Sequence, residues 1–267
     1  MHIKTPSQIA DATLTAGNSK IHLTRHDKKR LFIQSIMAGA FISFGGILSL
    51  IVGYGCPEIT GANPGIQKLL SGCMFPIGLI LVVVLGAELF TGNNALLIPA
   101  YMRKNATVGD IALNWSMVYA GNFVGALLFT FTLVVIPGVL SVAPYHDTIL
   151  AIGTAKVSQP WLTIFLKGIG ANWCVCLAVW LALSGKTLLE KCIGCWFPVM
   201  AFVALGYEHS IANMFYLPAA MAEGAGFTAW EAVWNNLIPA TLGNIVGGAL
   251  LVGCVHSYVH LKKPDEK

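Results

Sequence analysis

The chain has 267 residues, of which 56% are hydrophobic and only 10% are charged, with a formal net charge of +4 and a mean hydropathy of +0.71. A soluble domain carries about 25% charged residues, so this composition excludes an ordinary soluble protein and indicates one that spans a membrane. The pI of 8.7 comes from basic residues that flank the apolar runs, which gives no reason to expect a nucleic-acid partner.

The first 30 residues precede any apolar run. They contain the weakly amphipathic stretch PSQIADATLTAGNSKIHL, which predicts either a helix lying on the membrane surface or a cytoplasmic tail. A bilayer is crossed by about 20 apolar residues, and six runs reach that length: 31–54, 66–101, 111–136, 161–183, 192–221 and 233–258. We therefore expect an all-α polytopic membrane protein with one transmembrane domain, 31–258, between cytoplasmic segments 1–30 and 259–267.

Basic residues set the orientation. Thirteen of the 16 Lys and Arg residues fall on one side of the predicted membrane, while the opposite loops hold only Lys68 and Lys156. Loops rich in Lys and Arg remain in the cytoplasm. The pattern predicts that both termini are cytoplasmic and that the chain crosses the inner (plasma) membrane an even number of times.

The second and fifth runs share a polar motif. GAELFTGNN occupies residues 86–94 and GYEHSIANM residues 206–214, so that Gly, Glu and Asn match at an offset of 120. The third and sixth runs share GNFVG (121–125) and GNIVG (243–247), at an offset of 122. Residues 31–136 and 161–258 are therefore two copies of a three-helix unit. Because three is odd, the second copy is inverted in the membrane, a design found in many transporters.

The matched motifs also predict that helices 2 and 5 are broken at the midplane. Gly92 and Asn93 are poor helix formers, and Glu88 and Glu208 are expensive in hydrocarbon unless they have a function. A broken helix directs a half-helix N-terminus, which attracts anions, at the midplane. Paired breaks in an inverted repeat indicate a transport site.

A histidine beside the second break suggests how an anion could cross. Moving a bare anion into an apolar slot costs tens of kcal/mol, whereas protonating a carboxylate of Asp-like pKa at pH 7 costs about 4 kcal/mol. Histidine exchanges protons near neutral pH. Three routes stay open: proton exchange at His209, anion conduction past a transiently charged His209, and protonation in the vestibule.

The other chemical motifs are weak. Cys192 and Cys195 form a C-x-x-C without a second pair, and His256 and His260 have i, i+4 spacing at a helix end, so we expect no metal. A phosphate loop, a nucleophile elbow and a dinucleotide motif are missing from the sequence, which predicts neither an enzyme nor a cofactor. An aquaporin-like channel for neutral solutes would favour paired Asn-Pro-Ala motifs, and the sequence has none.

Four segments, SIMAGAFISFGG, GAELFTGNN, FLKGIGANWCVCLAVW and GYEHSIANM, closely resemble the formate/nitrite transporter family. The resemblance extends from about residue 5 to 258 and includes the lysine of GTAKVSQP. It implies an aquaporin-like fold, a homopentamer in the lipid bilayer with one pore in each protomer, and transport of small monovalent anions with protons. Formate is the first expected substrate, with hydrosulfide or nitrite as alternatives and a neutral solute as the alternative of a different class.

The resemblance also implies roles for individual residues. His209 becomes the central pore histidine, and Thr91 its hydrogen-bond partner. Two hydrophobic constrictions are implied, made of Phe75, Leu79, Leu89, Phe90, Val175 and Phe202. A polar group near the outer vestibule is implied, made of Lys156, Asn172, Glu208 and Asn213. Because a free carboxylate would repel anions, we expect Glu208 to pair with Lys156, Asn172 or a backbone donor.

Overall fold

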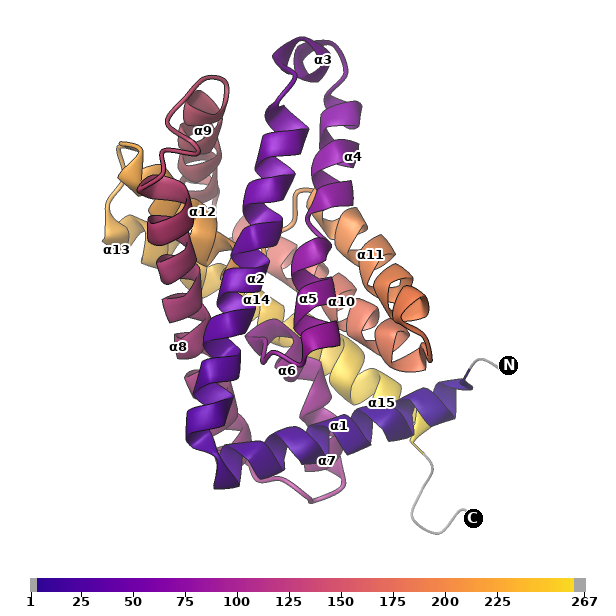
Figure 1. Cartoon of the computed structure of the whole chain (residues 1–267). Helices are drawn as coiled ribbons and strands as arrows, with labels where there is room; N and C mark the ends of the chain where they lie inside the picture. Colours follow the sequence, from indigo (N-terminus) through magenta and orange to yellow (C-terminus); the bar gives the residue numbers. More distant parts are fainter. Residues whose placement is uncertain (1–3, 262–267) are drawn as a thin grey trace.

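The computed structural model describes residues 4–261, which form a helical bundle with six membrane crossings (Figure 1). Four crossings are unbroken: α2 (Lys28–Tyr54); α8 (Val108–Phe129) with η1 (Thr130–Val135); α10 (Trp161–Ser184); and the last, which runs through α13 (Ala229–Glu231), η2 (Ala232–Leu237), α14 (Ile238–Ile245), η3 (Val246–Cys254) and α15 (Val255–His260). The predicted 259–267 tail therefore begins inside α15, and its residues 262–267 lie outside the described part.

The second and fifth crossings are interrupted, as the repeat predicts. The second consists of α4 (Pro64–Met74), α5 (Ile77–Leu85), α6 (Phe90–Leu96) and α7 (Ile98–Met102), and the fifth of α11 (Leu188–Ala204) and α12 (Ser210–Ala222). Five helical stretches within the described residues are long and apolar enough to cross a membrane. The fifth crossing is not among them because its break leaves halves of 17 and 13 residues.

Each break begins at a glycine with a left-handed backbone. Gly86 ends α5 with a φ of 73° and Gly206 follows α11 with a φ of 70°. Residues with a side chain rarely adopt this conformation, so glycine is the residue that turns the chain out of the helix here. Four residues later α6 and α12 begin, both inside the bundle. The prediction of an inverted repeat with helices 2 and 5 broken is confirmed.

Three crossings begin at threonine caps. Thr107, Thr187 and Thr228 each accept a hydrogen bond from the backbone of an acidic residue three positions later, whose carboxylate bonds back to the threonine N–H. Such a capping box satisfies backbone donors that a helix start leaves free. The crossings therefore begin up to four residues before the predicted apolar runs, because the polar cap belongs to the helix.

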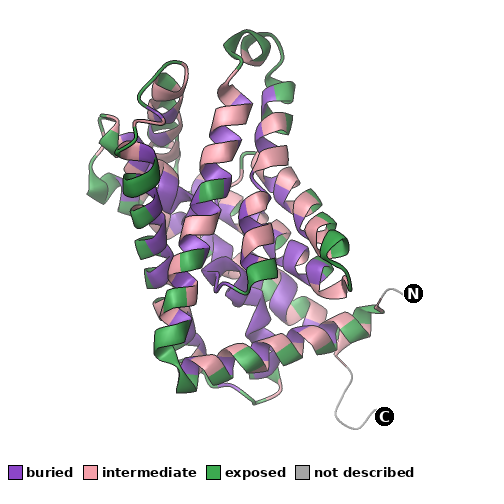
Figure 2. Cartoon of the chain, in the orientation of Figure 1, coloured by how far each residue is buried: buried purple, intermediate pink, exposed green. Residues whose placement is uncertain are grey.

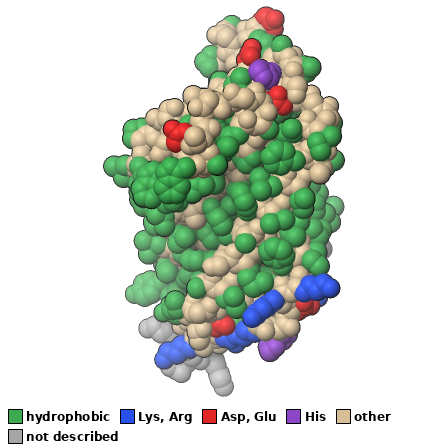
Figure 3. Space-filling view, turned by 90° about the vertical axis from the view of Figure 1, so that its left-hand side faces the viewer, with side chains coloured by type: hydrophobic (Ala, Val, Ile, Leu, Met, Phe, Trp, Pro, Cys, Tyr) green, Lys and Arg blue, Asp and Glu red, His purple; other side chains and the backbone are tan. Residues whose placement is uncertain are grey.

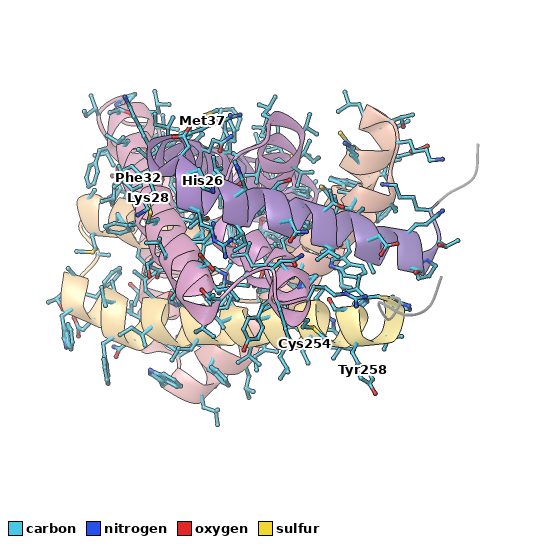
Figure 4. The ribbon with its side chains drawn as sticks, turned by 90° about the horizontal axis from the view of Figure 1, so that it is seen from below. His26, Lys28, Phe32, Met37, Cys254 and Tyr258 are labelled. Atoms are coloured by element: carbon cyan, nitrogen blue, oxygen red, sulfur yellow. The ribbon has the colours of Figure 1, made fainter. Side chains whose placement is uncertain are left out.

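Helix α1 (Pro6–His26) lies across one end of the bundle (Figure 1). Seen from below, it crosses the other helices and ends near His26 and Lys28, where α2 begins (Figure 4). Thr5 and Gln8 form its capping box. The face that it buries against the bundle carries Ala10, Thr13, Gly17, Ile21 and Thr24. The segment is thus helical and packs against the bundle. Helices α3 (Pro57–Ala62) and α9 (Tyr145–Ser158) lie at the opposite end (Figure 1).

The exterior and interior differ as expected for a membrane protein. Buried residues concentrate where the broken helices meet, and the outer helix faces are more exposed (Figure 2). Apolar side chains cover the middle of the face in Figure 3, and Lys and Arg gather at the end where α1 lies. Leu166, for example, is 56% exposed on a crossing helix. An apolar belt between charged ends suits a bilayer.

Candidate functional site

The first helix break is held by one buried asparagine. Asn122, on α8, donates from Nδ2 to the carbonyl oxygens of Ser35 at 2.7 Å and Glu88 at 2.9 Å. Its Oδ1 accepts the backbone N–H of Phe90 at 2.9 Å. A break in hydrocarbon frees backbone groups that no lipid can satisfy. The amide of Asn122 provides those missing partners.

The second break repeats this arrangement. Asn244, on α14, donates to the carbonyl oxygens of Gly168 at 2.8 Å and Glu208 at 2.9 Å. Its Oδ1 accepts the backbone N–H of Ser210 at 2.9 Å. The equivalence of Asn122 and Asn244 follows the offset of 122 found in the sequence.

A buried carboxylate accompanies each break. Near the first, Glu88 accepts the side-chain amide of Asn93 at 2.7 Å, and that amide also donates to Asn114 at 2.9 Å. The ammonium of Lys20, on α1, lies 2.6 Å from the other oxygen of Glu88. Burying a carboxylate without a cation is costly, and Lys20 compensates it.

The second carboxylate has a matching lysine and asparagine, and Asn236 also donates to it at 3.3 Å. Glu208 accepts from Asn213 at 2.7 Å, and Asn213 also donates to Asn236 at 2.6 Å. The ammonium of Lys156, on α9, lies 2.9 Å from Glu208. Of the three partners expected for Glu208, Lys156 is the one that binds its carboxylate.

Lys20 is a site residue that the sequence prediction missed. It belongs to the amphipathic segment before the repeats, where a lysine resembles any other surface lysine. The available signal was indirect: if Glu208 requires a cation, Glu88 at the matched position requires one too. The structure shows that α1 and α9 supply these cations at opposite ends.

Asn172 does not lie with the other members of the polar group predicted near the outer vestibule. It is fully buried and does not line the cavity that holds Lys156. Its Nδ2 lies 3.1 Å from the carbonyl oxygen of Thr91, 3.0 Å from Oδ1 of Asn94 and 2.6 Å from the carbonyl oxygen of Asn244. The amide of Asn172 therefore links the regions of the two breaks. Backbone carbonyl groups freed at this depth need such a donor.

Two cavities approach the breaks from opposite ends. The Lys156 cavity has a volume of about 280 Å³, and its lining includes Lys156, Glu208, Phe75, Phe202, His209 and Asn213. The Lys20 cavity has a volume of about 210 Å³, and its lining includes Lys20, Glu88, Leu79, Leu89, Gly92 and Asn93. Each cavity therefore combines one Lys–Glu ion pair with apolar side chains, and a second lysine, Lys68 or Lys191, also lines each cavity.

His209 lies at the inner end of the Lys156 cavity and is only 3% exposed. Its Nδ1 accepts the backbone N–H of Ala212 at 3.1 Å, so the imidazole is the N-cap of α12. An accepting nitrogen carries no proton, so the neutral ring carries its proton on Nε2. That nitrogen lies 3.0 Å from Oγ1 of Thr91 and donates to it across the two breaks.

Aromatic rings pack next to His209. The ring of Phe202 stacks on the imidazole with a centroid distance of 5.8 Å and an interplanar angle of 22°. Phe75 meets Phe202 edge-on at 5.7 Å. The predicted constriction residues thus separate, with Phe75 and Phe202 on the Lys156 side and Leu79 and Leu89 on the Lys20 side.

Two other predicted constriction residues lie outside these linings. Phe90 is buried, and its ring meets Tyr119 edge-on at 4.9 Å and Trp115 at 6.2 Å, on the α8 side. Val175 is buried in the hydrophobic core. Neither side chain lines the Lys156 or the Lys20 cavity. The structure therefore associates both with packing around the breaks.

Comparisons with known proteins agree with this arrangement. The family model "Formate/nitrite transporter" matches residues 7–258. The chain belongs to the formate/nitrite transporter family, whose members are transporters and channels, and it is therefore a membrane transport protein rather than an enzyme.

Curated relatives match over nearly their whole length. The formate channel FocA of Escherichia coli is 38% identical, over 97% of this chain and 95% of its own. A probable formate transporter of Methanothermobacter thermautotrophicus is 40% identical, over 88% of this chain and 90% of its own. A formate channel of Bacillus thuringiensis is 35% identical, over 97% and 96%.

Solved structures share the fold. One described as an FNT family ion channel has a TM-score of 0.86 and 27% sequence identity, covering 94% of this chain and 98% of its own. Another, described as a pentameric formate channel with formate bound, has a TM-score of 0.77 and 32% identity, covering 88% of this chain and 98% of its own.

Replacing Asn244 with alanine should destabilise the protein, because the Glu208 carbonyl oxygen and the Ser210 N–H at the second break lose a partner. The carbonyl oxygen of Gly168 on α10 loses one as well. We expect a loss of at least about 3 kcal/mol, since each of the three buried groups costs roughly 1–3 kcal/mol when it loses its partner. The measurement is the temperature at which protein purified in detergent loses its native elution profile. Asn105→Ala, at an exposed turn, is the control. Equal melting of the two variants would contradict the assigned role.

Proposed function

We propose that this chain is a channel for small monovalent anions, with formate as the first substrate. It collects the anion at a Lys–Glu pair in each cavity and passes it between the cavities at His209. The internal symmetry carries the proposal, with two buried ion pairs, two cavities and one titratable ring between them. The formate channels among the relatives support formate as the substrate.

The ion pairs let each cavity attract an anion without binding it tightly. An ammonium in the wall of a narrow cavity raises the local concentration of anions. The carboxylate of Glu88 or Glu208 keeps the total charge of each pair near zero, so the anion is held weakly enough to leave. Conduction needs this combination of favourable binding and easy release.

The apolar walls then select the form that crosses. Phe75 and Phe202 on one side, and Leu79 and Leu89 on the other, offer no hydrogen bonds to replace the water around an anion. The neutral acid loses far less solvation than the anion when it enters such a slot. The substrate therefore crosses with a proton.

His209 is the proposed point of proton exchange. Its neutral ring is held with Nδ1 accepting from Ala212 and Nε2 donating to Thr91. To donate its Nε2 proton and end as a neutral ring, His209 must first bind a proton at Nδ1. Binding that proton breaks the hydrogen bond that Nδ1 accepts from the N–H of Ala212. Exchange at His209 is therefore coupled to loosening of the first turn of α12.

Flux into liposomes tests the function. Purified protein in liposomes should admit labelled formate faster at pH 5.5 than at pH 7.5, since more of the substrate is protonated at the lower pH. Nitrite, hydrosulfide and lactate in parallel rank the anions. A higher rate for nitrite or hydrosulfide would change the substrate within the family. Transport of glycerol with no anion flux would instead establish a channel for neutral solutes.

His209→Asn separates the structural role of the histidine from its titration. Asparagine is among the best N-cap residues, so its Oδ1 can accept from Ala212 while its side chain cannot exchange protons near pH 7. We expect the variant to assemble normally and to lose the steep pH dependence of formate flux, or the flux itself. The measurement is initial uptake between pH 5 and 8.

An unchanged rate and pH profile in His209→Asn would remove His209 from proton transfer. The substrate would then take its proton in the vestibule. In that case Lys156→Ala becomes the more damaging change, because it removes the charge that gathers anions at the entrance.

The same reasoning extends to assembly and placement. We propose a homopentamer, since a solved relative is described as pentameric. We propose one channel domain, 31–258, built from copies 31–136 and 161–258. The proposed location is the inner (plasma) membrane, with both termini in the cytoplasm, because Lys and Arg gather at the α1 end of the face seen in Figure 3.

Cysteine labelling tests this orientation. Cys56 is exposed at the end opposite α1, so a membrane-impermeant maleimide should label it from outside intact cells. In a Cys56→Ser background, a cysteine at Pro144 should label from outside and one at Lys104 only after permeabilisation. Labelling of position 104 in intact cells would reverse the proposed orientation.

A further inference from the structure

The two Lys–Glu pairs have almost the same exposure but different neighbours. The side chains of Lys156 and Lys20 are 15% and 16% exposed. The ammonium of Lys156 lies 5.4 Å from the centroid of the Tyr216 ring. The position that matches Tyr216 in the first repeat, 120 residues earlier, is Leu96, which lines the Lys20 cavity. The aromatic partner is therefore a departure from the internal symmetry.

We propose that Tyr216 is a positioning residue for Lys156 and gives the Lys156 cavity a higher affinity for small anions than the Lys20 cavity has. This inference rests on the proposed function. A cation within about 6 Å of a ring centroid is attracted to the face of the ring. The ring also restricts the flexible lysine side chain, so less conformational freedom remains to be lost when an anion binds.

The ring is itself fixed in place. The hydroxyl of Tyr216 donates to the carbonyl oxygen of Gly46, on α2, at 3.2 Å. Tyr216 also lies on α12, whose N-cap is His209, so one helix holds both the ring beside Lys156 and the histidine. Tyr216 lines the same cavity as Lys156, which places the ring at the entrance side of the constriction.

The ring changes how the ammonium is shared. An ammonium has three N–H donors. On Lys156, Glu208 takes one at 2.9 Å, the ring face takes up a second, and the third is available to an arriving anion. Lys20 lies closer to its carboxylate, at 2.6 Å, and has a leucine in place of the ring. Tyr216 thus draws the ammonium away from Glu208 and holds it ready for substrate.

The test measures formate uptake separately from each face, in right-side-out and inverted membrane vesicles. Tyr216→Leu, which copies the other repeat, should raise the KM on the Lys156 side about three- to tenfold. The maximal rate and the KM on the Lys20 side should stay unchanged. Tyr216→Phe keeps the ring and should remain within about twofold of the wild type. Tyr258→Leu, at an exposed tyrosine of α15 outside both cavities, is the control and should also leave KM unchanged.

Lys156→Gln separates failure of this inference from failure of the proposed function. We expect it to raise the KM on its own side, and adding Tyr216→Leu should then have no further effect, because Tyr216 acts through Lys156. If Lys156→Gln changes no KM, the proposed anion collection fails, and this inference fails with it. If Lys156→Gln raises KM while Tyr216→Leu does not, or if the Phe variant is as damaging as the Leu variant, the role of the ring is overturned. Should Tyr216→Leu not assemble, Tyr216→Met fills similar space without a ring face and replaces it.

Discussion

Satisfying the freed backbone at two helix breaks is the constraint on which the rest of this structure depends. A helix that stops inside hydrocarbon leaves N–H and C=O groups that lipid cannot bind. Asn122 and Asn244 each bind a carbonyl oxygen and an N–H of one break, and a third hydrogen bond ties each asparagine to a neighbouring unbroken helix, α2 or α10. Because those bonds fix where α6 and α12 begin, they also fix Thr91 and His209, the two side chains that meet between the cavities.

The scaffold is symmetric, but the chemistry at its centre is not. The N-cap of α12 is His209, whose ring accepts from Ala212, while the matched N-cap of α6 is Leu89, which makes no side-chain cap. One nitrogen of His209 therefore serves the fold and the other faces Thr91. The helix cap fixes the tautomer of the neutral ring, so a structural hydrogen bond decides that the ring proton lies on Nε2 and faces Thr91.

The features that could be predicted from the sequence are those marked by residues that are costly to bury in a membrane. Glutamate and asparagine at matched depths in apolar runs are expensive, so their offsets revealed the inverted repeat and both breaks. It was harder to predict which side chains form ion pairs and hydrogen bonds with these residues. Lys20 meets Glu88 only because α1 folds back across the bundle, and nothing in its local sequence distinguishes it from other basic residues. Asn172 was assigned to the vestibule because resemblance gives a residue a role but not its direction, and its amide turns inward to the carbonyls of the breaks. The ring of Phe90 likewise turns towards Tyr119 and Trp115.

Positions where the two repeats differ are the places to look for properties of this channel other than folding, such as a difference in anion affinity between its two sides. An inverted repeat that was symmetric in every side chain would present the same affinity to both compartments. Positions 89 and 209, and positions 96 and 216, break that equality with a titratable ring and with an aromatic face for a lysine. In a passive channel such differences cannot drive net flux in one direction, because the equilibrium between compartments is set by concentration and voltage alone. They can change the concentration at which each entrance saturates, so the two sides of one pore can be tuned to the different substrate levels that they face.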